Sequence, residues 1–411
     1  MLTLDNLVGP VVFVIDALDE CGGQFTSNGI SDDPDSHLIV SDMLEALVLF
    51  SRSPVMLSVK FFVTSRPETH IRDTPISNAA FSTVLRLHTV SKDQVTADIR
   101  LYITTRLRGT AQLRSRFTDH DIDMLTRLSD GLFIVAATAL QYALGAGIDK
   151  AAMRFKKLLN ATGDGFSTGA IAPLDRMYAV ILTAAVRVDR VEVDGLEVLM
   201  KLLASILSAR MTLSVAALAE LSEISPDQLR ATLADLHAAV HVPDSDLEPS
   251  LRAVHASFGD YLLERAERNL RIEPSLGDGI LARGCLQVMA SKLFFNVSQC
   301  HSSYESNAPT QPNSIPLSLE YACLHWIYHL SMPVENGMSL NERFLPWIRR
   351  DSIQSASSRL EADINDLFRP RLLFWLEVMS LLGQVRRAAA MLLFAAATVS
   401  YHGWFYWEEQ R

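Results

Sequence analysis

The chain has 411 residues, 49% of them hydrophobic, which predicts about two to four domains with buried cores and excludes a largely disordered chain. Its formal net charge of −10 argues against nucleic acid or an anionic membrane surface as the main partner. None of the four cysteines stands in a CxxC pair, and the first residues lack the basic region of a signal peptide, so we predict reduced thiols and a cytoplasmic location.

The first quarter of the chain has strand patterns that alternate with a helical pattern. Residues 11–15, VVFVI, form a continuous β-branched and aromatic run, typical of a strand buried on both faces. Residues 37–50 have apolar side chains at helical spacing, and residues 60–65, KFFVTS, predict a second buried strand. Residues 83–88, TVLRLH, predict a third, weaker strand. Together they predict an α/β layer over residues 1–91.

Beyond this layer the apolar spacing is helical. Residues 92–190 carry several amphipathic segments and predict a helical domain. Residues 191–270 combine a helix, a helix-turn-helix, two short strands and a final helix, an order typical of a winged helix. Residues 271–411 predict an α-helical C-terminal domain, in which the apolar stretch 388–407 contains polar residues and favours a buried helix over a membrane span.

The helix-turn-helix has a charge pattern that argues against DNA recognition. Ser225 and Pro226 are expected to begin one of its helices, because proline suits the first helical position. Residues 211–256 contain two basic residues, both arginine, and seven acidic ones. A DNA-binding module needs cations that face phosphates, so we interpret this segment as an interdomain module.

Two histidines four residues apart, His325 and His329, have the spacing of zinc ligands on one helix face. No glutamate stands between them, and the intervening residues are Trp, Ile and Tyr. Packing within the core of an aromatic helix is the preferred interpretation.

Acidic residues directly follow the first predicted strand. Asp16 ends the run VVFVI, and Asp19 and Glu20 follow within one turn. A carboxylate at the carboxyl end of a strand can hold Mg²⁺ during phosphoryl transfer, and a second can orient or deprotonate the attacking water. The alternative is an acidic turn after a core strand.

The second predicted strand ends in a hydroxyl and a cation. Its continuation is Ser65, Arg66 and Pro67, after Thr64. The planar fork of an arginine binds phosphate oxygens in a bidentate manner, so this strand end could bind a γ-phosphate. The alternative is a surface arginine in a strand-to-loop turn.

The two strings IDALDEC and FFVTSRPE together resemble the Walker B and sensor 1 pair of NACHT-domain proteins of mushroom-forming fungi, the nephrocystin-like branch of the STAND class of P-loop NTPases. The later strings LHTVSKDQVTADIRLYITTRL, LSDGLFIVAATAL, PLDRMYAVIL, VHASFGDYL and RLLFWLEVMSLLG are also similar to this family. The resemblance spans nearly the whole chain. It implies a partial P-loop NTPase core, a helical lid domain, a winged helix and an α-helical C-terminal domain.

The resemblance implies roles for individual residues of the core. Asp16 would be the Mg²⁺ aspartate, and Asp19 and Glu20 the extra acidic pair of the family, with Glu20 preferred over Asp19 as the catalytic carboxylate. Ser65 and Arg66 would contact the nucleotide as sensor 1.

Two further nucleotide contacts are implied outside the core. Gly131 falls where related NTPases carry a Gly-x-Pro that touches adenine, although Phe133 replaces the proline here. His255, in VHASFGDYL, falls where the winged helix of such switches places a histidine on the β-phosphate of ADP. The alternative for His255 is an interdomain histidine whose hydrogen bonds are satisfied within the fold.

The chain departs from the family in lacking the P-loop, GxxxxGK(S/T). No Gly-Lys pair occurs, and the first lysine is Lys60. The intact family uses ATP or ADP with Mg²⁺, and the P-loop supplies most of the phosphate contacts. We therefore predict that this chain alone neither binds ATP tightly nor hydrolyses it. We also expect a sheet that lacks the P-loop strand, as in a truncated gene model, a fragment or a degenerate paralogue.

The implied function is an ATP/ADP-controlled oligomerisation switch in intracellular signalling, with non-self recognition or cell death as the setting suggested by family analogy. Its partners would be other protein chains, including copies of itself, with no nucleic acid and no membrane. The alternative is a nucleotide-independent protein–protein interaction module or an inactive paralogue.

Overall fold

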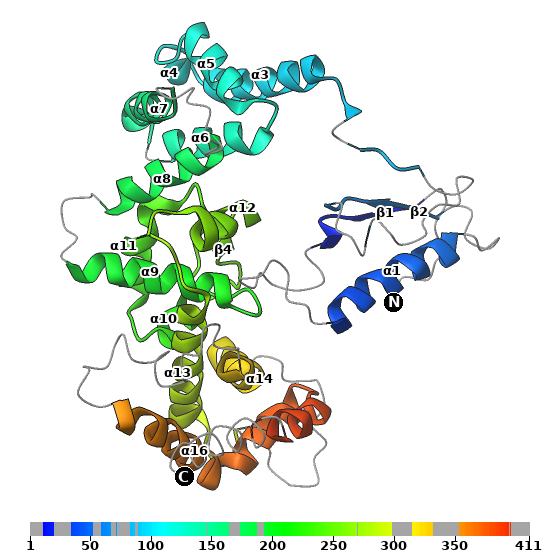
Figure 1. The fold of residues 1–411 in the computed structure, drawn as a ribbon, viewed down its shortest axis with the longest axis vertical. Coiled ribbons are helices and arrows are strands. Elements are labelled where there is room, and N and C mark those ends of the chain that lie inside the picture. Colours follow the sequence, from blue (N-terminus) through cyan, green and yellow to red (C-terminus); the bar gives the residue numbers. More distant parts are fainter. Residues whose placement is uncertain are drawn as a thin grey trace, which may run out of the picture. The chain divides into compact units, whose positions relative to one another are not determined.

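A computed structural model of the chain describes residues 11–19, 34–51, 59–66, 71, 83–86, 89–145, 147–163, 173–186, 193–268, 270–297, 315–331, 353–393 and 395. The chain divides into two compact units, Met1–Gln94 and Val95–Arg411. The described residues are mostly helical, with a few short strands (Figure 1). No helix in these ranges is long and apolar enough to cross a membrane.

The first unit contains a β–α–β arrangement. Strand β1 (Val11–Ile15) is followed by helix α1 (Pro34–Ser51) and strand β2 (Val59–Val63), which confirms both predicted strands and the helix between them. The two strands pair in parallel, with Ile15 opposite Val63. Leu18 and residues of α1 form a small buried core against one face of the sheet.

The prediction that residues 11–15 form a strand buried on both faces is wrong, and the predicted second buried strand is covered on one face only among the described residues. Phe61 faces α1, since its ring lies 6.0 Å from that of Phe50. Side chains alternate between the faces of a strand, so Val12, Val14 and Phe62 point to the opposite face. They are 56%, 67% and 58% exposed, because no second layer packs on them within the described part of the chain.

The predicted third strand is also not observed in the residues that can be assessed. Residues 83–86 are not part of a strand, and residues 87–88 lie outside the described ranges. Val84 and Leu85 are 68% and 73% exposed, so their side chains are not packed into a core. Among the described residues, the sheet of the first unit therefore has two strands.

The second unit begins with a series of helices. They are α3 (Lys92–Arg108), α4 (Ala111–Arg114), α5 (Asp119–Ser129), α6 (Phe133–Leu144), α7 (Ile148–Gly163) and α8 (Pro173–Val186). Local sequence explains where α5 begins: Thr118 and Asp121 form a reciprocal capping box. The apolar faces of these helices share one buried core with the rest of the unit.

The middle of the second unit contains the short strands. It comprises α9 (Val193–Ser208), α10 (Val215–Leu221), α11 (Pro226–Leu233), the 3₁₀ turn η5 (Ala234–Leu236), β3 (Val240–His241), β4 (Arg252–Ala253), α12 (Ala256–Asp260) and the π-helical turn η6 (Tyr261–Arg265). Helix α11 begins as predicted, with the Ser225 side chain capping it and Pro226 in its first turn. Strands β3 and β4 form an antiparallel pair, and the elements follow the expected order.

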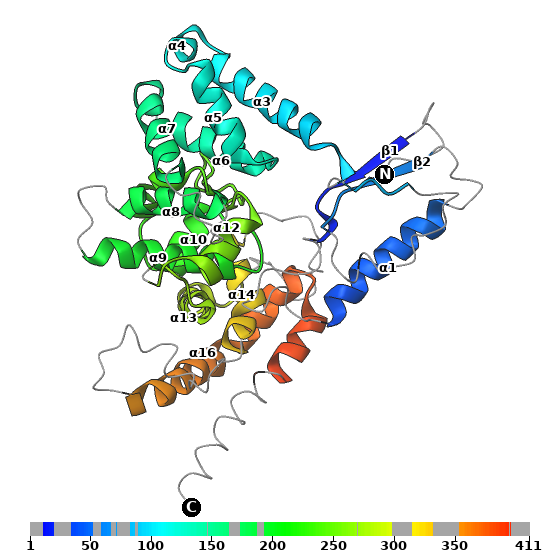
Figure 2. The same cartoon turned by 45° about the horizontal axis from the view of Figure 1, so that its top comes forward.

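Of the last helices, the first two pack against this middle part and the third packs against those two. They are α13 (Pro274–Lys292), α14 (Leu317–Ser331) and α16 (Ile353–Leu381), followed by a helical stretch over residues 385–393. Helix α13 lies beside α9 and α14 (Figure 1 and Figure 2). Gly277 and Gly284 permit a close approach, since an added Cβ would lie 2.2 Å from the carbonyl oxygen of Ala204 and 2.0 Å from that of Leu221. Helix α13 therefore packs directly on the backbones of α9 and α10.

Candidate functional site

The carboxyl ends of β1 and β2 are joined by hydrogen bonds beyond the strands themselves. The Thr64 N–H donates to the Ile15 carbonyl at 2.9 Å, and the Leu18 N–H donates to the Thr64 carbonyl at 2.9 Å. The Thr64 hydroxyl donates to Asp16 Oδ1 in a very short contact and accepts from the Ala17 N–H at 2.9 Å. Thr64 thus fixes the turn that carries the first aspartate.

The backbone of this turn is strained. Ala17 has a φ of 53°, in the left-handed region that residues other than glycine rarely adopt. An alanine there costs roughly 1–2 kcal/mol, and such strain is found where the surrounding structure holds a functional turn in place. Here the strain lies between Asp16 and Leu18, one side chain exposed and the other fully buried.

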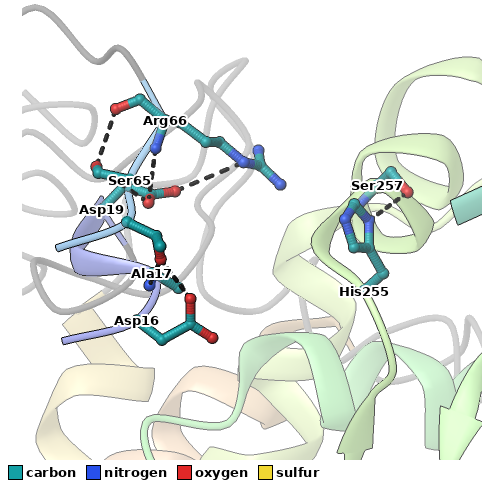
Figure 3. A network of polar contacts seen from close by, with 8 residues as sticks. Asp16, Ala17, Asp19, Ser65, Arg66, His255 and Ser257 are labelled. Atoms are coloured by element: carbon teal, nitrogen blue, oxygen red, sulfur yellow. Dashed lines mark hydrogen bonds and ion pairs between the residues drawn. The ribbon is translucent and has the colours of Figure 1, made fainter. Parts of the chain in front are cut away.

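Asp19 connects the first strand end to the second. Its Oδ1 accepts from the Arg66 N–H at 2.9 Å and lies 3.2 Å from the Ser65 hydroxyl. Its Oδ2 lies 3.5 Å from Arg66 Nε (Figure 3). The Asp19 side chain is 9% exposed and that of Arg66 is 42% exposed, so the guanidinium is held at one side and open on the other.

The structure thus brings together four of the predicted site residues at one sheet edge: Asp16, Asp19, Ser65 and Arg66 (Figure 3). Glu20 lies outside the described residues. In this arrangement Asp19 neutralises and orients Arg66, whereas Asp16 presents an exposed carboxylate. Their catalytic and metal-binding roles stay predictions.

The exposed Asp16 carboxylate has the chemistry of a Mg²⁺ ligand but is not part of a complete protein cage. No group of three or more His, Cys, Asp or Glu side chains that could hold a metal occurs among the described residues. Proteins commonly bind Mg²⁺ through one or two carboxylates, with waters and substrate phosphates filling the remaining positions. A single exposed aspartate at this edge is compatible with that mode.

Sequence reasoning assigned Ser65 to the site but not Thr64, although Thr64 makes the contact with Asp16. The register offers a way to find it. Ile15 lies opposite Val63 in the last pair of the two strands. The residues that follow them, Asp16 and Thr64, are therefore also neighbours across the sheet. A hydroxyl one residue beyond the end of β2 was therefore the better candidate for a partner of Asp16.

His255 lies in the second unit, where it caps helix α12. Its Nδ1 accepts from the Ser257 N–H at 3.1 Å and lies 2.7 Å from the Ser257 hydroxyl (Figure 3). That hydroxyl lies 2.9 Å from the Tyr178 hydroxyl of α8. The interpretation of His255 as a histidine hydrogen-bonded within the fold has direct support, and its contact with a nucleotide stays a prediction.

Gly131 occupies the turn between α5 and α6. Its φ of 83° follows the φ of 42° at Asp130, so two consecutive left-handed residues reverse the chain. An added Cβ would meet nothing within 4 Å, so backbone conformation rather than space favours glycine here. Phe133 is 46% exposed at the start of α6 and lies 6.0 Å from the ring of Tyr102. The predicted adenine contact of Gly131 is not tested by this geometry.

The histidine pair of α14 lies in a buried polar cluster of the second unit. His329 Nδ1 is 2.7 Å from Asp278 Oδ1, and His329 Nε2 is 2.7 Å from the Tyr321 hydroxyl. The Arg210 N–H donates to the same Tyr321 hydroxyl at 3.1 Å. Packing within the core, as predicted, describes both histidines, since His325 is 9% and His329 1% exposed.

His325 is buried without a partner for Nδ1 among the described residues. Burial and, to a smaller extent, the nearby Arg387, His329 and Arg210 lower the pKa of His325 to about 3. The side chain is therefore neutral at physiological pH. It contacts the Tyr321 ring at 4.9 Å between ring centres.

Neither a scan against protein-family models nor searches of curated proteins and of solved structures give a match to this chain.

Proposed function

We propose that this chain is part of a NACHT-type, STAND-class signalling NTPase, whose intact form is an ATP/ADP-controlled oligomerisation switch. One observation carries the proposal. The strings that resemble Walker B and sensor 1 end on adjacent parallel strands, and at this edge Thr64 is hydrogen-bonded to Asp16, and Arg66 to Asp19. The carboxyl edge of a parallel sheet is where α/β proteins bind their ligands.

The side chains of this edge suit a magnesium nucleotide. The exposed Asp16 would hold Mg²⁺, and the open side of the Arg66 guanidinium would bind phosphate oxygens. Thr64 and Asp19 would fix these two side chains before the ligand arrives. The 411 residues contain no phosphate-binding loop, so this chain alone would neither bind ATP tightly nor hydrolyse it.

Within the same proposal, residues 92–190 form the helical lid, residues 191–270 a winged helix and residues 271–411 the α-helical C-terminal domain. The capped helix α11, the antiparallel pair β3–β4 and α12 support a winged helix. Its acidic surface composition favours contacts with protein over DNA. The switch would act in the cytoplasm on other protein chains.

The first test is to map the 5′ end of the transcript and to search upstream of VVFVIDALDE for an in-frame GxxxxGK(S/T). The longer product should then bind Mg-ATP in titration calorimetry. Asp16→Asn and Arg66→Ala should each weaken binding at least about tenfold, since each removes a charged contact. Lys60→Ala, an exposed change on β2, is the matched control. Absence of a P-loop in the transcript, or ATP binding that ignores both substitutions, would overturn the proposal.

A nucleotide-independent interaction module is the second candidate. It is favoured by apolar side chains exposed near the end of α13 and on α16, where Phe295 and Leu373 are 80% and 74% exposed. The Phe295 ring lies 6.4 Å from that of Phe374 of α16, so the two segments adjoin, and contiguous exposed apolar surface marks interaction sites. Concentration-dependent self-association of the chain without nucleotide, abolished by Phe295→Ser, would favour this candidate. A monomer at all concentrations would argue against it.

A further inference from the structure

A histidine of α14 has a buried ring nitrogen whose hydrogen-bonding capacity is not used. His325 is 9% exposed, and its Nδ1 has no hydrogen-bond partner within the described ranges. A buried polar atom without a partner costs about 1–3 kcal/mol, so native folds nearly always provide one from the chain, a water or a ligand. The ring of Tyr321 packs beside the imidazole, with ring centres 4.9 Å apart, and leaves this nitrogen unpaired. The unused nitrogen therefore points to a water or a ligand as its partner.

Two arginines from other elements bring positive charge to the same place. Arg210 stands two residues after α9, and Arg387 belongs to the helical stretch 385–393. Burial is the main cause of the lowered pKa of His325, and the charges of Arg387 and Arg210 lower it further. Partial burial and the charge of Arg210 likewise lower the pKa of Arg387. The two guanidiniums are thus close to each other and to the imidazole.

Both arginines are held in place by contacts with the fold. The Arg210 backbone N–H donates to the Tyr321 hydroxyl at 3.1 Å, and its Nη1 donates to the Tyr328 hydroxyl at 2.9 Å. The Arg210 guanidinium carbon also lies 3.9 Å from the centre of the Tyr328 ring, a cation–π contact. Arg387 precedes Ala388, which is 1% exposed in the core, whereas Arg387 itself reaches solvent. The charged cluster is therefore fixed by the fold and accessible to a small ion.

These two arginines differ from other arginines of the second unit in lacking a carboxylate partner. Arg154, which is mostly buried, pairs with Asp235 at 2.6 Å. Neither Arg210 nor Arg387 forms an ion pair with any residue that the structure describes. Asp278, an acidic side chain of the same cluster, is hydrogen-bonded to a histidine of α14 at 2.7 Å instead. Charges removed from water are normally paired, so an anion is the missing partner of this cluster.

We propose that Arg210, His325 and Arg387 form a binding site for a phosphate group in the second unit. The planar forks of two guanidiniums bind phosphate oxygens in a bidentate manner, and their two charges match a phosphate dianion. The neutral imidazole would complete the site by donating from Nδ1–H to a further oxygen. The site uses no residue of the sheet edge in the first unit, so it does not rest on the proposed function above.

The test is titration calorimetry of the full chain with inorganic phosphate at neutral pH, with sodium chloride holding the ionic strength constant. We expect saturable binding of one phosphate per chain, and at least about tenfold weaker binding of acetate, which carries a single charge. Arg210→Gln and Arg387→Gln should each weaken phosphate binding at least about tenfold, since each removes a charged contact. His325→Phe should weaken it less, because it removes a neutral donor.

Arg386→Gln is the matched control, because it removes an exposed arginine beside Arg387 and changes the net charge equally. It should bind phosphate as the wild type does, and so should Asp16→Asn at the sheet edge. An unchanged circular dichroism spectrum without phosphate would show that Arg387→Gln is folded. Absence of saturable binding by the wild type, acetate binding as tight as that of phosphate, or equal losses in Arg386→Gln and Arg387→Gln would overturn the proposal. A failure of Mg-ATP binding would refute the proposed function and leave this result standing.

Discussion

The closest helix contact of the second unit gives a prediction with a definite sign. Gly284 lies where α13 crosses α10, and an added Cβ would lie 2.0 Å from the carbonyl oxygen of Leu221 and 2.9 Å from its Cα. Ordinary contact begins at 3.4 Å. Gly284→Ala must therefore separate the two helices by about 1.4 Å, the difference between 3.4 and 2.0 Å. The opposing atoms belong to a helix backbone and cannot rotate away.

Two opposing effects set the magnitude. Replacing glycine by alanine inside a helix with free space stabilises it by about 1 kcal/mol. Overpacking a core typically costs about 1–3 kcal/mol. Because Gly284 meets backbone atoms at 2.0 Å, we expect the upper end of this cost. The net result would be a loss of about 1–2 kcal/mol in the free energy of unfolding of the second unit.

Urea unfolding followed by circular dichroism measures the loss, and amide hydrogen exchange locates it. Protection should fall in α10 and α13 first, because the displacement separates these two helices. Gln287→Ala, an exposed change on the same helix, should stay within about 0.5 kcal/mol of wild type. If Gly284→Ala instead raised the free energy of unfolding by about 1 kcal/mol, the gain expected from helix propensity alone, the close approach of the two backbones would be refuted.

Three further perturbations probe other parts of the fold. Burial and Arg387 lower the pKa of His325 in the folded chain to about 3, whereas the ordinary value in the unfolded chain is 6.5. The unfolded chain therefore binds this proton first as the pH falls. The contribution of His325 to stability is full above pH 6.5 and is lost as the pH falls toward 3. The free energy of unfolding falls by at most about 1.4 kcal/mol per pH unit. Urea unfolding of His325→Phe at several pH values across this range should show a weaker pH dependence. An unchanged pH dependence would contradict the lowered pKa of His325. Asp278→Asn should cost about 1–3 kcal/mol, because it removes the charge that faces the buried His329, and an unchanged unfolding midpoint would exclude a role for that charge. Ala17→Gly should relieve the backbone strain at the φ of 53°. Amide exchange at the ends of β1 and β2 should then slow by up to about fivefold, equivalent to about 1 kcal/mol. Faster exchange would exclude strain at this position.

The helices and strands that could be predicted from the sequence are those that a local pattern of residues determines. The run VVFVI is a strand because β-branched and aromatic side chains suit a pleated backbone, and α11 begins at Ser225 and Pro226 because a hydroxyl caps it and proline fits its first turn. Burial depends on what packs against an element, which a local pattern does not contain. The exposed Val14 of β1 is the clearest case.

The candidate site could likewise be predicted only in part. Parallel neighbours end at the same edge, so the sequence could place Asp16, Asp19 and Arg66 close together. It could not assign their partners, because the bond between Thr64 and Asp16 follows from the register of the strands. The hydrogen bond between Tyr178 and Ser257 could not be predicted either, since the two residues stand 79 positions apart in the sequence.

The exposed face of the first sheet bears on the proposed function. Parallel strands occur almost only where helices cover both faces of the sheet, and two strands alone are marginally stable. Helix α1 covers the face of Phe61, whereas Val12, Val14 and Phe62 on the opposite face are more than half exposed. Apart from Lys60, the side chains of both faces are apolar, which is typical of the middle of a three-layer α/β arrangement. This mismatch between composition and exposure supports the proposal that β1 and β2 are two strands of a larger NTPase core, in which further strands and helices would cover this face.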